Sequence, residues 1–200
     1  TNNNVLLAGR DMTLAQVTQT GNASVTITAT GPAATNTPIV FNGSYLKTGG
    51  AESTLTLRAD GRINMGSNAI TNSSAVSGGK LNVVLWSDYS NYNSGGLTVG
   101  SITTLGGGAW IGGSSTSQGS SAWVPYSGGA ILTVGNGASV GAINQNWNAI
   151  DLAGTISTAG GHIVVWSGAP YSTGYSFQAS TTSGLNSGAG NITIIGDSFQ

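Results

Sequence analysis

The chain has 200 residues, of which 38% are hydrophobic and 6% charged, and its formal net charge is −1. Because Lys and Arg number only five, the composition argues against binding to nucleic acid or to an anionic membrane surface. Cys is absent, which excludes disulfide scaffolds, Cys-ligated zinc sites and thiol nucleophiles.

The predicted secondary structure is β-strand throughout. Wherever apolar residues recur at helical spacing, Gly, Ser, Thr or Asn interrupts the pattern. No apolar run approaches the length of a membrane span. Short segments rich in β-branched residues are instead bounded by Gly or Asn. In chain order the predicted strands are residues 24–30, 53–59, 81–87, 97–100, 131–135, 162–167 and 191–196.

Two parts of the chain repeat one another, about residues 50–94 and about 128–168. "INMGSNAI", beginning at Ile63, matches "INQNWNAI", beginning at Ile143, at five of eight positions with an offset of 80. Trp86 and Trp166 keep that offset. Repetition over tens of residues with variable turns is typical of a solenoid. We therefore predict one all-β domain over residues 1–200, a parallel β-helix of roughly seven coils, in preference to an antiparallel sandwich.

Strand alternation predicts which side chains form the interior. His162 and Trp166 of the second copy correspond to Asn82 and Trp86 of the first, and we expect these four on the outward face. The predicted inward residues are Leu81, Val83 and Leu85 in the first copy and Ile163 and Val165 in the second.

Few residues offer catalytic chemistry. Asp60 and Asp88 are 28 residues apart, so they fall on neighbouring coils, and paired carboxylates would suit glycoside hydrolysis. Both nevertheless occupy turn sequences in which Asp is common, and His162, the single histidine, lies in a predicted strand. Calcium-binding aspartate repeats are missing. We expect no catalytic, metal or cofactor site, with a polysaccharide-degrading enzyme as the least favoured alternative.

Aromatic residues follow several of the predicted strands. Such a stripe on one side of a rod would stack on sugar rings or contact a protein partner. The other interpretation, which we favour, is that each tryptophan is covered by the loop that follows it. The candidate contact residues are Trp86, Tyr89, Tyr92, Trp123, Tyr126, Trp166 and Tyr171. Four asparagines stand in N-x-S/T sequons and are candidate glycosylation sites: Asn22, Asn42, Asn72 and Asn191.

One long stretch resembles a known family. "LTLRADGRINMGSNAITNSSAVSGGKLNVVLWSD", followed by "GGLTVGSITTLGGGAWIGG", is similar to the rod of filamentous-haemagglutinin-like adhesins, exoproteins of two-partner secretion in Gram-negative bacteria. The resemblance implies a right-handed β-helix, export through an outer-membrane transporter and display at the cell surface or release as a filament. It also implies that some sequons are glycosylated. The family's secretion signatures "NPNL" and "NPNG" do not occur, so we expect an internal stretch of such a rod.

From these observations we expect a secreted structural or adhesive rod rather than an enzyme. Its expected partners are the two-partner-secretion transporter, a glycan or protein on a host or neighbouring cell, and further copies of itself in filaments. A carbohydrate-binding module that uses the aromatic turns is the alternative from a different class.

Overall fold

The structure is a computed structural model that describes residues 4–31, 37–75, 77–89, 95–113, 150–166, 175, 177–195 and 200. These residues contain strands and no helix, so the all-β prediction is confirmed for them. The strands are three to seven residues long and alternate with corners. Among the described strands, neighbours in chain order do not pair with each other, which is the connectivity of a winding chain.

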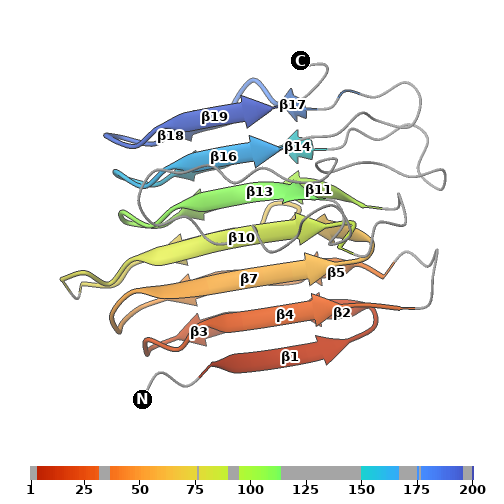
Figure 1. Cartoon of the computed structure of the whole chain (residues 1–200), viewed down its shortest axis with the longest axis horizontal. Helices are drawn as coiled ribbons and strands as arrows, with labels where there is room; N and C mark the ends of the chain where they lie inside the picture. Colours follow the sequence, from red (N-terminus) through yellow and green to blue (C-terminus); the bar gives the residue numbers. More distant parts are fainter. Residues whose placement is uncertain are drawn as a thin grey trace.

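The strands form three parallel sheets (Figure 1). The first sheet contains, in spatial order, β1 (Val5–Gly9), β4 (Val25–Ala29), β7 (Ser53–Ala59), β10 (Leu81–Ser87), β13 (Ala109–Gly113), β16 (Ile163–Trp166) and β19 (Ile192–Ile195). The second contains β2 (Met12–Leu14), β5 (Ile39–Phe41), β8 (Arg62–Asn64), β11 (Gly96–Val99), β14 (Ile150–Leu152) and β17 (Phe177–Ala179). The third contains β3 (Val17–Gln19), β6 (Tyr45–Lys47), β9 (Ala69–Asn72), β12 (Ser101–Thr103), β15 (Thr155–Ser157) and β18 (Gly184–Asn186).

This arrangement is a parallel β-solenoid, as predicted, and it contradicts the antiparallel alternative for the described strands. Each pairing joins one winding of the chain to the next in parallel, for example Val83 of β10 to Leu55 of β7. The stacked windings then share one interior, because each inward side chain lies over its counterpart in the winding before.

Two aliphatic columns run the length of the first sheet. We call them the Val83 column and the Leu85 column. The Val83 column is Val5, Val25, Leu55, Val83, Ala109, Ile163 and Ile192. The Leu85 column is Leu7, Ile27, Leu57, Leu85, Ile111, Val165 and Ile194. The five residues predicted to face inward, Leu81 among them, all belong to the main core, so that prediction is confirmed.

The other two sheets complete the interior with columns of their own. The second sheet contributes Met12, Ile39, Ile63, Leu97, Ile150 and Phe177. The third contributes Val17, Tyr45, Ile70, Ile102, Ile156 and Leu185. The core is therefore a continuous apolar filling that no single winding could bury alone.

The register of the coils differs from the ungapped sequence repeat in one place. Matching "INMGSNAI" to "INQNWNAI" sets Ile150 against Ile70, but Ile150 lies in the column of Ile63 in the second sheet, whereas Ile70 lies in the third. Residues 143–149 fall outside the described residues, so the duplication stays a prediction. Trp86 and Trp166 do share one column, because Trp86 pairs with Gly112, and Trp166 follows Val165, which pairs with Ile111, the residue before Gly112.

The corners that lead into the first sheet bring the backbones of successive coils very close together. A Cβ on Gly161 would overlap the carbonyl oxygen of Gly107, and one on Gly190 would overlap that of Gly161. These positions need glycine because the next winding leaves no space for a side chain.

Candidate functional site

The first predicted contact residue, Trp86, is packed rather than open to solvent. It lies on the outward face of β10, but its exposed fraction is only 3%. Its ring meets Tyr89 edge-on, with centroids 4.7 Å apart, and meets Trp110 of β13 at 6.5 Å. With Val84 and Val164 these residues form a second apolar cluster, separate from the main core. We call this set the outer cluster.

Arg58 of β7 adds a charge to the outer cluster. Its guanidinium carbon lies 5.4 Å from the ring centroid of Trp86 and 5.4 Å from that of Tyr89. This geometry is that of a cation–π contact with two rings at once. Because Arg58 precedes Trp86 in the same outward column, the register itself sets the contact.

Trp110 belongs to the outer cluster but was not among the predicted contact residues. It pairs in register with Val84 on one side and Val164 on the other, and its exposed fraction is 7%. A Cβ on Gly112 would meet the six-membered ring of Trp110, so this ring lies over Gly112, beside Trp86. The signal in the sequence was the alternation in "GAWIGG", where Trp110 flanks the inward Ile111.

A sugar-stacking site needs an accessible ring face, and Trp86 does not provide one. Trp166 is partly buried. Tyr92, Trp123, Tyr126 and Tyr171 lie outside the described residues, so their predicted contact role is neither supported nor opposed. Trp86 is covered by Tyr89 of the turn that follows it and by Trp110 and Arg58 of the neighbouring strands, and whether the rest of the following loop covers it stays a prediction.

The carboxylates Asp60 and Asp88 follow the ends of adjacent paired strands, β7 and β10. Both are 1% exposed, and an Asp60 carboxylate oxygen accepts a hydrogen bond from the Gly31 N–H at 2.9 Å. His162 stands at the opposite end of the first sheet, just before β16, so the fold does not bring a histidine to this pair. Within the described ranges there is no group of three or more His, Cys, Asp and Glu residues that could hold a metal ion.

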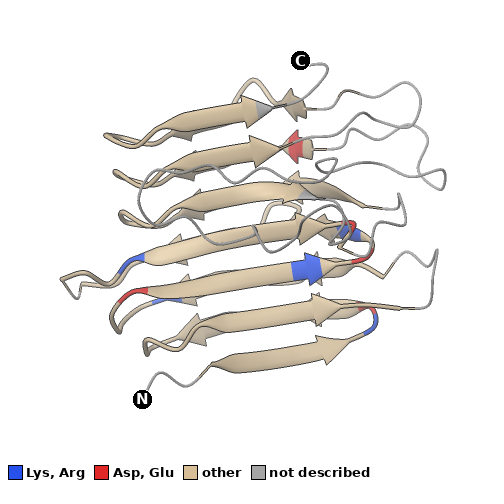
Figure 2. Ribbon diagram, in the orientation of Figure 1, with Lys and Arg blue, Asp and Glu red and all other residues tan. Residues whose placement is uncertain are grey.

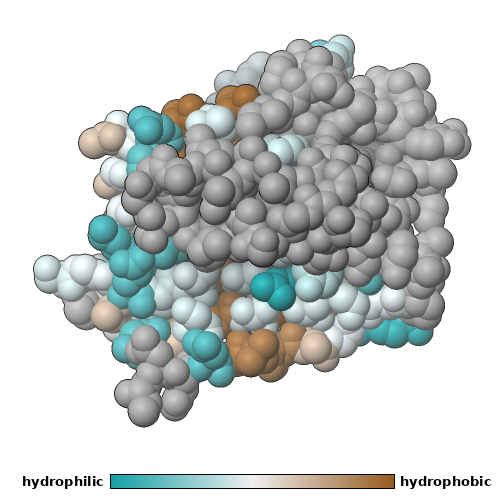
Figure 3. All heavy atoms as spheres, viewed as in Figure 1, coloured by the Kyte–Doolittle hydropathy of each residue, from teal (hydrophilic) through white to brown (hydrophobic). Residues whose placement is uncertain are grey.

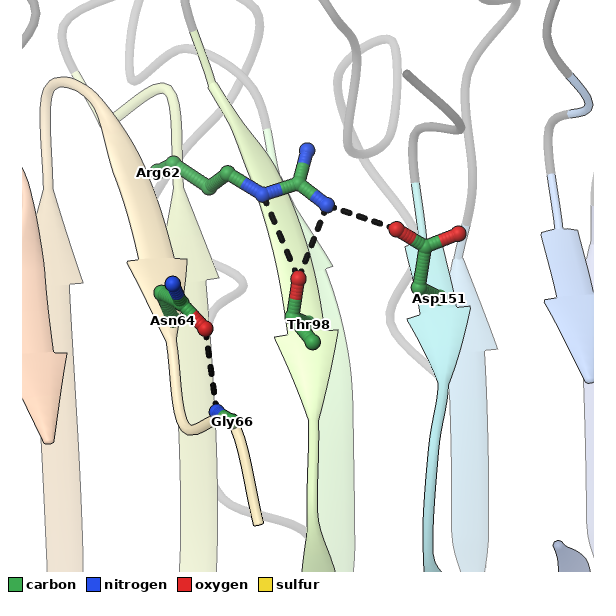
Figure 4. Close-up of polar contacts among 5 residues, drawn as sticks. All are labelled: Arg62, Asn64, Gly66, Thr98 and Asp151. Atoms are coloured by element: carbon green, nitrogen blue, oxygen red, sulfur yellow. Dashed lines mark hydrogen bonds and ion pairs between the residues drawn. The ribbon is translucent and has the colours of Figure 1, made fainter. Parts of the chain in front are cut away.

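An ion pair links coils that the sequence did not connect. Arg62 of β8 donates to a carboxylate oxygen of Asp151 in β14 at 2.7 Å, although the two are 89 residues apart. In Figure 4 the Arg62 side chain crosses β11, and it also donates to the Thr98 hydroxyl at 2.9 Å. Burial lowers the pKa of Arg62, and the nearby Asp151 carboxylate opposes that shift. The arrangement joins three coils of the second sheet.

Polar side chains form a ladder in the interior, at the ends of the third-sheet strands, where the chain turns towards the first sheet. We call it the polar ladder. It consists of Gln19, Lys47, Asn72, Thr104, Thr158 and Ser187, all buried. Most of these side chains donate to a backbone carbonyl of the corner that follows. Thr104 donates to Gly107 at 2.5 Å, Ser187 donates to Gly190 at 2.6 Å, and Thr158 donates to Gly161. The ladder thus satisfies corner carbonyls that burial removes from water.

Lys47 is the charged member of the polar ladder, and its exposed fraction is 0%. Its ammonium nitrogen donates to three carbonyl oxygens, of Gly49 at 2.6 Å, Ala51 at 3.0 Å and Gly21 at 3.2 Å. Burial lowers the pKa of Lys47. Two residues earlier, burial raises the pKa of Tyr45 to about 12, and its hydroxyl donates to the Gln19 side-chain oxygen at 2.6 Å. Since all these bonds are internal, the ladder is a structural element.

The predicted glycosylation sites differ in accessibility. Asn22, Asn42 and Asn191 are exposed. Asn72 is 2% exposed, and its amide nitrogen donates to the carbonyls of Gly79 at 2.7 Å and Thr104 at 2.9 Å. A glycan on Asn72 would require this part of the polar ladder to open, whereas the other three sites need no such change.

No family model, curated protein or solved structure matches this chain. Within the described residues, no helix is long and apolar enough to cross a membrane.

Proposed function

We propose that this chain is a structural and adhesive rod, part of a secreted bacterial surface adhesin or extracellular filament that mediates attachment or aggregation. The observation that carries the proposal is the pair of aliphatic columns in the first sheet, because stacked windings with a continuous core build length rather than an enclosed cavity. The similarity of residues 55–113 to filamentous-haemagglutinin-like rods points to the same role.

The charge distribution supports a spacer rather than an enzyme. In Figure 2 the charged residues of the described part lie mostly at strand ends and corners, and the faces of the sheets are largely uncharged. Such a surface offers few groups for acid–base chemistry. The burial of Trp86 also disfavours the carbohydrate-binding alternative at that residue. The proposed partners are an outer-membrane transporter for export and a glycan or protein on another cell for attachment.

The proposal includes two finer features of the winding, a right-handed sense and roughly seven coils. The strong preference of parallel β-connections for the right-handed sense supports the first. The seven strands of the first sheet support the second. With a rise of about 4.8 Å per coil, such a rod would be about 30 to 35 Å long.

Electron microscopy of the native, full-length product in negative stain tests the proposal. We expect a thin filament that projects from the cell or is released from it. In parallel, beads coated with the 200-residue chain should bind cells or one another more than uncoated beads. Compact particles in the micrographs, together with inert beads, would contradict the proposed function.

A further inference from the structure

The corner between β5 and β6 contains an exposed asparagine that is followed by glycine. In Figure 3 the hydrophilic side chains gather mostly at the edges of the visible face, where Figure 1 shows corners of the chain. Asn42 stands in another corner, directly after the end of β5, and its side chain is exposed. The sequence has one other Asn-Gly pair, Asn136 and Gly137, which lies outside the described residues. Asn42 and Gly43 are therefore the pair whose chemistry can be argued from contacts.

The stack of coils requires glycine at position 43. A Cβ on Gly43 would overlap the main-chain nitrogen of Gln16 and would lie 2.9 Å from the carbonyl carbon of Ala15, both in the preceding coil. Only a residue without a side chain allows such an approach. The absence of that side chain also leaves the main-chain nitrogen of Gly43 open to the side chain of Asn42. The fold thus fixes a reactive neighbour for this asparagine.

The two groups that would react are not held by other groups. Among the described residues, the Asn42 side-chain amide makes no hydrogen bond, and the Gly43 N–H donates to no carbonyl or side chain. The main chain on either side is held, because the Asn42 N–H donates to the Leu14 carbonyl at 2.7 Å and the Ser44 N–H donates to the Gln16 side-chain oxygen at 3.3 Å. No hydrogen bond of the reacting groups has to break before they meet.

Asn72 shows the opposite situation in the next coil of the third sheet. Its exposed fraction is 2%, its amide nitrogen donates to two backbone carbonyls, and its side-chain oxygen accepts the Ser74 N–H at 3.0 Å. The residue that follows it, Ser73, donates its own N–H to the Lys47 carbonyl at 2.8 Å. Because both groups are held, reaction at Asn72 would first require these bonds to break.

We propose that Asn42 is a self-modifying site, which the folded chain converts to isoaspartate and aspartate without an enzyme. The main-chain nitrogen of Gly43 attacks Cγ of Asn42 and forms a C–N bond. The side-chain nitrogen leaves as ammonia, with the Gly43 amide proton as its third hydrogen. Water then opens the cyclic imide at one of its two carbonyls, which gives isoaspartate or aspartate. Asparagine is among the thermolabile residues of proteins, and the inference does not depend on the adhesive function.

The two products affect the corner differently. Aspartate keeps the main chain and adds a negative charge at an exposed position. Isoaspartate adds one carbon to the main chain between the Asn42 N–H, which is bonded to Leu14, and Gly43, which lies against Gln16. The corner then no longer fits the preceding coil. Either product also removes the N-x-S/T sequon at this position, so a modified chain cannot be glycosylated there.

Peptide mapping by mass spectrometry tests the site after incubation of the folded 200-residue chain at 37 °C and pH 8. We expect Asn42 to gain one mass unit over days, with isoaspartate as the main product. The Ser73→Gly variant is the matched control, since it places a glycine after an asparagine that is buried and hydrogen-bonded. In the folded variant, Asn72 should react at least about tenfold more slowly than Asn42, because its hydrogen bonds must break first. In concentrated urea the two sites should react at similar rates.

The melting temperatures of the products test the effect on the corner. The isoaspartate form, separated by ion exchange, should melt below the unmodified chain. Asn42→Asp should melt like the wild type, because it keeps the main chain. Asn42→Gln should show no modification at this position, since its longer side chain would have to close a larger ring.

Three results would overturn the proposal. If Asn42 keeps its amide in the folded chain but loses it in urea, the fold protects this site. Equal rates at Asn42 and at Asn72 in the folded Ser73→Gly variant would show that the contacts around them make no difference. An isoaspartate form that melts like the unmodified chain would show that the corner accepts the longer main chain.

Discussion

Asn82 and His162 accept the same hydrogen bond in different coils. The Asn82 side-chain oxygen accepts the Gly108 N–H at 2.9 Å, and His162 Nδ1 accepts the Asn191 N–H at 3.0 Å. Both acceptors stand just before the inward residues of their strands, and both donors occupy the corresponding position one coil further on. A side chain at this position therefore fixes the N–H with which the next winding begins.

Substitution of His162 tests whether this bond stabilises the stack. His162→Ala removes the acceptor for the Asn191 N–H and should lower the free energy of unfolding by about 1 kcal/mol. His162→Asn introduces the acceptor used by Asn82 and should recover most of that loss. Urea unfolding at pH 8 measures both, and equal stability of the two variants would show that the bond contributes nothing.

A methyl group at Gly161 should disrupt the stacking of the corners. The added Cβ would overlap the Gly107 carbonyl oxygen of the preceding coil. This clash can be relieved only if the two windings move apart. We expect Gly161→Ala to cost about 3 kcal/mol or more, in the range of severe backbone and packing defects. Gly184→Ala is the control, since a Cβ there meets nothing within 4 Å, and it should be neutral or slightly stabilising. Thermal unfolding compares the two.

Removal of the Asp151 charge should destabilise the second sheet. Asp151→Asn leaves the Arg62 guanidinium, with a side chain only 6% exposed, without its carboxylate. A buried charge that loses its partner typically costs about 3 to 5 kcal/mol, and we expect the lower end because Asp151 is 31% exposed.

The double variant Arg62→Met, Asp151→Asn should be more stable than Asp151→Asn, since it removes the unpaired charge. Asp11→Asn, at an exposed aspartate, provides the control and should change the free energy of unfolding by less than about 0.5 kcal/mol. Equal losses for the single and double variants would show that the unpaired Arg62 charge has no cost of its own, and the absence of a loss in either variant would mean that the ion pair is energetically irrelevant.

Tyr45 should make the fold sensitive to alkaline pH. Burial raises its pKa from the ordinary value of 10.0 to about 12 in the folded chain, so between these pH values the folded chain binds more protons than the unfolded chain. The free energy of unfolding should then fall by about 1.4 kcal/mol for each pH unit above 10. Lys47 has the opposite effect at lower pH. Because burial lowers its pKa, the unfolded chain binds more protons than the folded chain between that lowered pKa and the ordinary one. The free energy of unfolding therefore rises with pH in this range.

Urea unfolding at several pH values from 8 to 11.5 measures this dependence. Tyr45→Phe should lose the decline above pH 10, and the control Tyr175→Phe, at a residue 37% exposed, should keep it. An unchanged slope in Tyr45→Phe would mean that another group causes alkaline unfolding.

Trp86→Ala separates a packing role from a binding role. Loss of this buried side chain should cost about 3 to 5 kcal/mol. Binding to a glycan array at low temperature, where the variant is still folded, should equal that of the wild type. Reduced glycan binding with an unchanged melting temperature would support the carbohydrate-binding alternative.

Most of the first sheet was predictable because its strands are long enough to show alternation, although β1 and β13 were not predicted. The predicted segments 53–59 and 81–87 coincide with β7 and β10, and their inward residues followed from a period of two. The second and third sheets consist mostly of three-residue strands, each with only one or two inward positions. Such segments have no period to detect, which is why, among the described strands of these two sheets, only β11 was predicted.

The polar contacts were less predictable than the core. Lys47 reads in the sequence as an ordinary surface lysine, and only the corner carbonyls of Gly21, Gly49 and Ala51 make its burial possible. Arg62 and Asp151 meet although they stand two windings apart in the second sheet, in β8 and β14. Their approach depends on register across sheets, which strand pattern alone does not fix.

The direction of the hydrogen bonds between windings determines how the molecule responds to tension. These bonds run along the stack, so a pull on its two ends loads them one winding after another rather than all together. Val25 and Leu55, successive members of one column, are 30 positions apart in the sequence. Each winding that opens therefore exchanges a rise of about 4.8 Å for about 100 Å of extended chain. Under load the protein behaves as a stepwise extensible tether, which limits the force that reaches whatever it holds.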